Sequence, residues 1–434
     1  MRRCAVLFVA LLGLGCARVA LPEAHIRPGQ AAGLTWERAV QLALAHHPAL
    51  QQARDALSAE ALARNQALGA YLPTADGAVS RSRTRTGSSG SPSDALALDL
   101  DVSQPLFTGF ETTGEALKVW QEWEAARWAY VEESATVRQS LRTAFVELLR
   151  LYQLLDVNRT IAERRKDNAE LLRLRYEAGR EHEGSWHRAQ AIADQAAFDV
   201  RQAQRRITSQ SLALGQQLGG RFETPLALAG TLEALIPAAP APPEDYAALA
   251  ERAPTVRRLV RSAAALKAAI VSSQSALWPT VEGTFNYEQS GDRPSELEHA
   301  STLGVRVSVP LFHGGRNVQG VLEARADYRA AVEAARGARD ARIAQLGERW
   351  AEFQDAWEQV AVRRAFLEAA RQRAEIVRAQ YTSGLANFQD FDIAEQELAD
   401  SEKAHVQSLA DVLTAEADWV FTQGGTLEEA AHGQ

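Results

Sequence analysis

The side chains of this sequence that could do chemistry are a histidine pair and a set of scattered carboxylates. His182 and His187 stand five residues apart, whereas metal ligands on one helix face usually stand four apart, so no metal site is predicted. Four carboxylates could act as general acids or bases, but all belong to stretches that alternate polar and apolar residues: Asp99, Asp101, Glu282 and Glu288. The alternation explains them without catalysis, and the chain is expected to be neither an enzyme nor a cofactor-binding protein.

The composition excludes further classes of function. The 434 residues carry 47 basic and 55 acidic side chains, a formal net charge of −8, whereas a nucleic-acid-binding protein normally shows a basic excess. The only cysteines are Cys4 and Cys16, so the rest of the chain has no disulfide, thiolate metal site or cysteine nucleophile. No glycine-rich loop ending in Lys-Ser or Lys-Thr occurs, which argues against nucleotide binding.

The first residues resemble an export signal. A basic start precedes an apolar run that is too short to span a bilayer and has the length of a signal-peptide core. Cys16 then stands where bacterial lipoproteins carry the cysteine that is acylated after cleavage. We therefore expect a signal peptide at 1–15 and an extension at 16–33 that is lipidated at Cys16. The alternative is ordinary signal cleavage a few residues later, which would discard Cys16.

The sequence contains an internal duplication. Four landmarks recur about 205 residues apart, namely Pro48 with Pro254, Pro73 with Pro279, Pro105 with Pro310 and Gly179 with Gly384. The first repeat is expected at 34–235 and the second at 244–430, followed by a tail at 431–434. Residues 236–243 between them are rich in proline and cannot be helical. The two repeats should therefore share one architecture.

Each repeat contains two short stretches with the alternation of a strand that has one apolar face. The strands are expected at 74–83, 96–103, 281–288 and 302–309, which gives hairpins at about 73–107 and 279–312. A soluble sheet packed on a core would show this pattern, and so would a membrane barrel. Strand lengths of about ten residues favour the barrel, as do aromatic residues at the hairpin bases: Tyr71, Phe107, Phe110, Trp278 and Phe312. Four strands cannot close a barrel, so several copies would have to combine.

Long helices are expected to flank the hairpins. Residues 111–179 contain no proline and would form a helix of about 100 Å at 1.5 Å per residue. Apolar residues step by three and four in both repeats, as in supercoiled helices packed side by side: Leu141, Phe145, Leu148, Tyr152 and Leu155, then Ile343, Leu346, Trp350, Phe353, Trp357 and Val360. The chain should turn back near Gly179 and Gly384, each within a Tyr-x-x-Gly element.

Taken in order, these motifs closely resemble those of the TolC-like outer membrane factors, the exit ducts of bacterial efflux and type I secretion systems. The resemblance rests on Leu34–Pro48, Tyr71–Pro73, Ser103–Gly109, Val309–Gly315 and the two Tyr-x-x-Gly turns. Each motif alone is weak, but together they extend over nearly the whole chain that follows the N-terminal segment.

The resemblance implies a mainly α protein with a small membrane β-barrel. Three protomers of four strands would form a twelve-stranded barrel in the outer membrane of a Gram-negative cell, with a helical tunnel extending into the periplasm. The polar face of the strands would then line the barrel lumen: Asp99, Asp101, Glu282, Asn286, Glu288 and Arg306. Acylation of an N-terminal cysteine is frequent in the family, which supports lipidation of Cys16.

The resemblance also assigns roles to the turns that end the long helices. In the family a tyrosine holds the tunnel end closed and an aspartate ring lines its constriction; the matching gate residues are Tyr381, Gly384, Asp390 and Asp392. The two turns correspond to surfaces that contact a periplasmic adaptor protein, here through Tyr176, Gly179, Arg180, Gly384 and Leu385. The chain departs from some members at Ala386, where they carry arginine, and at Ile393 and Ser185, where they carry aspartate. The bonds of the latch are therefore not assigned.

The predicted function is a passive outer membrane channel of a tripartite efflux or type I secretion system. Its partners would be two further copies of the chain, the lipid bilayer, the adaptor and, through the adaptor, an inner-membrane pump of the RND, ABC or MFS type. The alternative is an exported coiled-coil scaffold whose strands form a soluble cap; a hydrolase is disfavoured because no convincing nucleophile and base occur together. Drugs, metal ions, small metabolites and polypeptides all remain open as cargo, which the pump selects.

Overall fold

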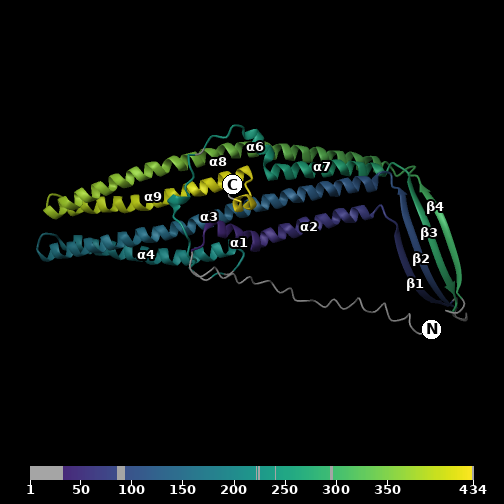
Figure 1. Ribbon diagram of the computed structural model, residues 1–434, viewed down its shortest axis with the longest axis horizontal. Coiled ribbons are helices and arrows are strands. Elements are labelled where there is room, and N and C mark those ends of the chain that lie inside the picture. The colour runs from purple at the N-terminus through teal and green to yellow at the C-terminus, as the bar shows by residue number, and fades with distance from the viewer. Residues whose placement is uncertain are drawn as a thin grey trace.

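A computed structural model describes residues 33–85, 93–220, 222, 225–239, 241–293 and 297–432. The expected signal peptide at 1–15, the lipidation site at Cys16 and the extension up to residue 32 lie outside the described residues. Figure 1 shows an elongated bundle of long helices with a sheet at one end. The fold is mainly α-helical, as the sequence predicted.

The first two helices, α1 (Trp36–His46) and α2 (Pro48–Gly69), are separated by a bend. The Thr35 hydroxyl accepts a 3.3 Å hydrogen bond from the Arg38 backbone amide and caps the start of α1. Pro48 occupies the first turn of α2, where its missing N–H leaves no helical hydrogen bond unmade. The bend therefore follows from this proline.

Four antiparallel strands form one sheet in the order β1-β2-β3-β4. Each repeat contributes one hairpin, and the strands are β1 (Thr74–Thr84), β2 (Ser93–Phe107), β3 (Thr280–Gly291) and β4 (Glu298–Ser308). The two hairpins join because β2 pairs with β3, with a register shift between Pro105 and Phe107. β1 and β4 form the edges, and neither has a second partner strand in the part of the chain that the structure describes.

Together with α2, five further long helices make up the body: α3 (Glu111–Glu177), α4 (Glu183–Gln217), α7 (Pro254–Ser275), α8 (Arg316–Ser383) and α9 (Phe388–Gln423). Far from the sheet they form a layer in the order α4-α3-α9-α8, and next to the sheet the order is α2-α3-α7-α8 (Figure 1). α3 packs closely on α7 at Gly114, where an added Cβ would lie 2.6 Å from the backbone nitrogen of Ser272. None of the described helices is both long and apolar enough to cross a membrane.

The main apolar core lies around the middle of the bundle. There α1, α3, α4 and α9 pack with three short helices: α5 (Leu232–Leu235), α6 (Tyr246–Arg252) and α10 (Leu427–Ala431). Leu141, Phe145 and Leu148 of the predicted stripe are fully buried, and Trp36 packs edge-on against Phe145 with ring centroids 5.8 Å apart. Burying a side chain of this kind contributes about 1.5–3 kcal/mol. The core that holds the protomer together is thus well separated from the sheet.

Candidate functional site

The sheet has one polar, acidic face. Because side chains alternate between faces, the register places all six predicted lumen residues on this face: Asp99, Asp101, Glu282, Asn286, Glu288 and Arg306. The Asn286 amide donates a 2.8 Å hydrogen bond to Asp101, and Arg306 lies 3.7 Å from Glu282. Asp76 of β1 stands opposite Asp101 and adds a further carboxylate. The strand pairing therefore gathers residues from both repeats into one charged surface.

The opposite face of the sheet is apolar and exposed. Val79 is 73% exposed and Leu303 84% exposed. The described helices hardly touch the strands, and Figure 1 shows the sheet standing at the end of the helical body. At its base, Phe110 packs edge-on against Phe107 and Trp278, with centroids 5.3 and 6.1 Å apart. A continuous exposed apolar surface of this kind marks a contact with a membrane or another protein.

The two helical turns form the end of the molecule that is farthest from the sheet (Figure 1). Gly179 and Gly384 have φ angles of 71° and 83°, which a glycine adopts without strain. Arg180 is exposed beside the first turn, and Leu385 is 82% exposed beside the second. Tyr176 stacks on Trp186 of α4, with ring centroids 5.5 Å apart. The predicted adaptor residues therefore lie together at one exposed end.

Tyr381 lies inside this end and is 2% exposed. Its ring stacks on Phe391 at 4.9 Å between centroids, and the Arg175 guanidinium lies over the ring, 4.4 Å from its centroid. The Tyr381 hydroxyl donates a 2.9 Å hydrogen bond to Glu181, and Arg175 donates a 2.6 Å bond to the Tyr381 carbonyl oxygen. Burial and the bond to Glu181 raise the pKa of the hydroxyl, which stays a donor at neutral pH. Tyr381 thus connects the α8–α9 turn to the α3–α4 turn.

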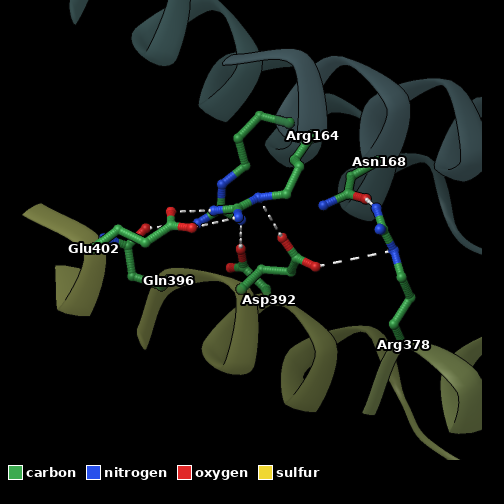
Figure 2. A network of polar contacts seen from close by, with 8 residues as sticks. Arg164, Asn168, Arg378, Asp392, Gln396 and Glu402 are labelled. Atoms are coloured by element: carbon green, nitrogen blue, oxygen red, sulfur yellow. Dashed lines mark hydrogen bonds and ion pairs between the residues drawn. The ribbon is translucent and has the colours of Figure 1, made fainter. Parts of the chain in front are cut away.

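Asp392, in the second turn of α9, is also buried. Its carboxylate accepts a 3.0 Å hydrogen bond from Arg188 of α4, and its other oxygen lies 3.5 Å from Arg165 of α3. Arg165 also donates a 2.8 Å bond to Gln396 of α9. Figure 2 shows Asp392 within the resulting polar network. This carboxylate holds α9 against both α3 and α4.

The network continues along the helices away from Asp392 (Figure 2). Arg164 of α3 donates two hydrogen bonds to Glu402 of α9, at 2.8 and 2.7 Å, in a bidentate geometry. Arg378 of α8 donates a 2.7 Å bond to Asn168 and lies 4.0 Å from Glu395. Glu395 is 2% exposed, and its Oε2 atom receives no hydrogen bond from the described residues. We call this set the tip ion cluster: Arg164, Arg165, Asn168, Arg188, Arg378, Asp392, Glu395, Gln396 and Glu402.

Asp390 does not join the tip ion cluster. Its side chain is exposed at the start of α9, and its backbone amide donates a 2.8 Å hydrogen bond to the Asn387 side chain, which caps the helix. Ile393, where some TolC-like factors carry aspartate, is 47% exposed. The structure therefore separates the two aspartates of the predicted gate into one buried and one exposed position.

Most residues of the tip ion cluster were not predicted from the sequence. Arg165 and Asp392 belong to different repeats, and no local pattern pairs residues so far apart in the chain. A weak signal existed, because Asn158, Arg165 and Asn168 are buried polar residues that continue the apolar stripe of α3. Polar residues at seam positions in long helices commonly specify how those helices pair.

The chain matches one protein family by its sequence and shares its fold with solved outer-membrane channels. The sequence profile of the outer membrane efflux protein family matches residues 39–220 and 246–421, one stretch in each repeat. The search of curated proteins found no match. The fold is shared with the outer-membrane channel OprN (20% identity, 90% of each chain covered, TM-score 0.79). It is also shared with VceC of Vibrio cholerae (21% identity, 90% of this chain and 96% of that chain, TM-score 0.77) and with the open state of MtrE of Neisseria gonorrhoeae (16% identity, 91% and 89%, TM-score 0.81).

The structural likeness extends over the sheet and the long helices alike, since about nine-tenths of this chain is aligned in each case. The profile match spans most of both repeats. The chain is therefore a member of the outer membrane efflux protein family.

Proposed function

We propose that the chain forms the outer membrane channel of a tripartite efflux or type I secretion system, as a homotrimer whose sheets close into one barrel. The observation that carries the proposal is the sheet, with its exposed apolar face, its acidic face and its two edges without outer partners among the described strands. In a bilayer each unpaired backbone N–H or C=O costs several kcal/mol. An inserted sheet would therefore need neighbouring copies to pair with β1 and β4.

The dimensions of the sheet support insertion. The strands have 11, 15, 12 and 11 residues, and a tilted strand needs about 9–11 residues to cross a bilayer. The apolar face would contact lipid and the acidic face would line a water-filled lumen. A soluble cap would instead bury the apolar face on a core, yet the described helices leave it uncovered. This observation disfavours the scaffold alternative.

The helices support the same closure. α8 forms one edge of the helical layer, and α2 and α4 form the opposite edge. The helices at both edges expose large apolar side chains, including Phe366 of α8 at 62%, Leu62 of α2 at 68% and Phe198 of α4 at 41%. Closing three protomers in a ring would bury these edges together with the strand edges. The number three comes from the resemblance to TolC-like factors, and twelve strands would make the barrel.

We infer that the turns at the far end act as the gate and the contact surface for an adaptor. Tyr381 and the tip ion cluster hold α9 against α3 and α4, so opening would require these contacts to break. Asp390 is free to face a central constriction, where three copies would attract cations. Exposed Arg180 and Leu385 would meet the adaptor, which would couple the channel to an inner-membrane pump.

Native mass measurement and planar-bilayer recording of the detergent-purified full-length protein test the proposal. The expected result is a trimeric mass and a cation-selective conductance that is reduced in the double variant Asp99→Asn, Asp101→Asn. Asp94→Asn is the matched control, because Asp94 lies on the opposite face of the same strand. A monomer that neither inserts nor conducts would contradict the channel. Equal selectivity in the lumen variant and the control would contradict the assignment of the faces.

A further inference from the structure

One part of the apolar face is basic. Along β1, Val79 is followed on the same face by Arg81 and Arg83, at the end of the strand farthest from the helices. Their side chains are 74% and 67% exposed. A lipid-facing position in the hydrocarbon layer would cost about 2–4 kcal/mol for each arginine. These residues therefore need an environment other than acyl chains.

The charge of these two arginines is only partly compensated. Every acidic residue of the described strands lies on the polar face except Asp94. Asp94 accepts hydrogen bonds of 2.7 and 2.9 Å from Arg83 and lies 3.9 Å from Arg81. One carboxylate shared by two guanidinium groups leaves a net positive charge.

A neighbouring protomer would not supply the missing acid. In the proposed ring, β1 would pair with the β4 strand of the next copy. The β4 residues on this face carry no carboxylate: His299, Ser301, Leu303, Val305 and Val307. The uncompensated charge would therefore persist in the assembled barrel and face outward.

Arg83 lies at the height of a membrane surface, and Arg81 lies two residues below it on the same strand. Arg83 follows Thr74, the first residue of β1, by nine residues. At about 3.4 Å per residue this is roughly 31 Å along the strand. A tilt of about 40° converts it to roughly 23 Å of height, close to the 25 Å of the apolar band of such barrels. Long arginine side chains extend further toward the headgroups.

We propose that Arg81 and Arg83 bind the phosphate group of a lipid in the outer leaflet. The inference rests on the proposed function, because it requires the apolar face to lie in a bilayer. Guanidinium groups bind phosphate oxygens through paired N–H donors, and the adjacent apolar residues of β1 and β2 would contact the acyl chains. Asp94 competes for Arg83, so the lipid phosphate would displace an internal ion pair.

The test uses the detergent-purified full-length trimer titrated with diphosphorylated lipid A and observed by native mass spectrometry. The double variant Arg81→Gln, Arg83→Gln should bind about 25-fold more weakly, since each basic residue near an anionic headgroup contributes a factor of about five. Asp94→Asn should bind more tightly than the wild type, because it removes the competing carboxylate. Arg306→Gln on the polar face is the control and should bind like the wild type.

The outcomes separate this inference from the proposed function. A wild-type trimer that conducts but binds dephosphorylated lipid A equally well would overturn the phosphate site and leave the channel intact. Unchanged lipid binding in the double variant would also overturn it. If added inorganic phosphate abolishes the difference in lipid A binding between the wild type and the double variant, the two arginines form a site for a phosphate ion and not for a lipid. A monomer without conductance would instead contradict the channel.

Discussion

α3 and α8 are the equivalent long helices of the two repeats, with 67 and 68 residues, yet they differ in burial. Eighteen residues of α3 are buried, against eight of α8. α3 has helices on both sides, whereas α8 lies at the edge of the layer. A duplicated unit thus yields one helix that stabilises the protomer and one that presents apolar residues outward. In the proposed ring, a neighbouring copy would cover the exposed side of α8.

The largest effect on the protomer is expected from Phe145→Ala in α3. Phe145 is fully buried against Trp36, so the substitution should lower the free energy of unfolding by about 3–5 kcal/mol. Chemical denaturation followed by circular dichroism measures this loss. A loss below about 1 kcal/mol would mean that the middle of α3 is not the core of the protomer.

The next largest effect is expected from Arg165→Gln, which removes one of the two arginines that contact the buried carboxylate of Asp392. Removing one partner of a buried ion pair costs about 3 kcal/mol or more. The backbone amides at the start of α9 should therefore exchange with solvent faster than in the wild type. Arg373→Gln in α8 is the control, because its 2.6 Å pair with Glu397 is about half exposed and is worth at most about 1 kcal/mol. Equal amide-exchange rates in the Arg165→Gln and Arg373→Gln variants would show that the ion pairs of α3 and α8 stabilise this end of the molecule equally.

A moderate, pH-dependent effect is expected from Glu428→Gln in α10. Glu428 accepts a 2.5 Å hydrogen bond from Tyr130 of α3 and a further bond from Ser134. Burial alone would raise the pKa of Glu428, but the hydrogen bonds from Ser134 and Tyr130 outweigh it and lower the pKa. The folded protein thus favours the carboxylate, whose stabilisation is complete above its unfolded pKa of about 4.5 and is lost as the pH falls further.

The variant should therefore lose about 1–2 kcal/mol at pH 7 and clearly less at pH 3.5. Urea denaturation of the wild type and the variant at both pH values measures the difference. A loss that is equal at the two pH values would contradict the role of the carboxylate in holding α10 on α3.

The smallest effect on the protomer is expected from Phe366→Glu in α8. Phe366 is 62% exposed, so the unfolding free energy of a protomer should change by no more than about 0.5 kcal/mol. The trimeric fraction in detergent should fall, because closure would bury the new charge. Phe198→Glu on α4 tests the opposite edge in the same way. A trimer that withstands both changes would show that these edges do not meet.

Much of the architecture follows from the sequence. The helix expected at 111–179 is found as α3 (Glu111–Glu177), because no proline interrupts it and glycine follows it. The alternation at 281–288 corresponds to β3 (Thr280–Gly291). The second apolar stripe shows the limit, since Leu346 is fully buried whereas Trp357 is only partly buried. A heptad pattern gives the packing face of a helix but not whether the helix lies centrally or at an edge.

Less of the candidate site than of the fold could be predicted from the sequence. The resemblance identified Tyr381, but its bonds to Arg175 and Glu181 join residues of different repeats, and only the folded chain brings them together. The tip ion cluster has the same origin. The six lumen residues were easier to group, because a period of two along a strand fixes the face of every side chain.

In the proposed barrel, β1 of one protomer pairs with β4 of the next, and cysteine cross-linking tests this pairing most directly. Ala78→Cys on β1 would be combined in one chain with Ala300→Cys, Thr302→Cys or Gly304→Cys on the same face of β4. The parent protein controls for Cys4 and Cys16, the only native cysteines. At least one pair should give a covalent trimer on oxidation that returns to a monomer on reduction. If every cysteine pair gives only monomer after oxidation, and the preparation shows no trimeric mass, the closed barrel is contradicted.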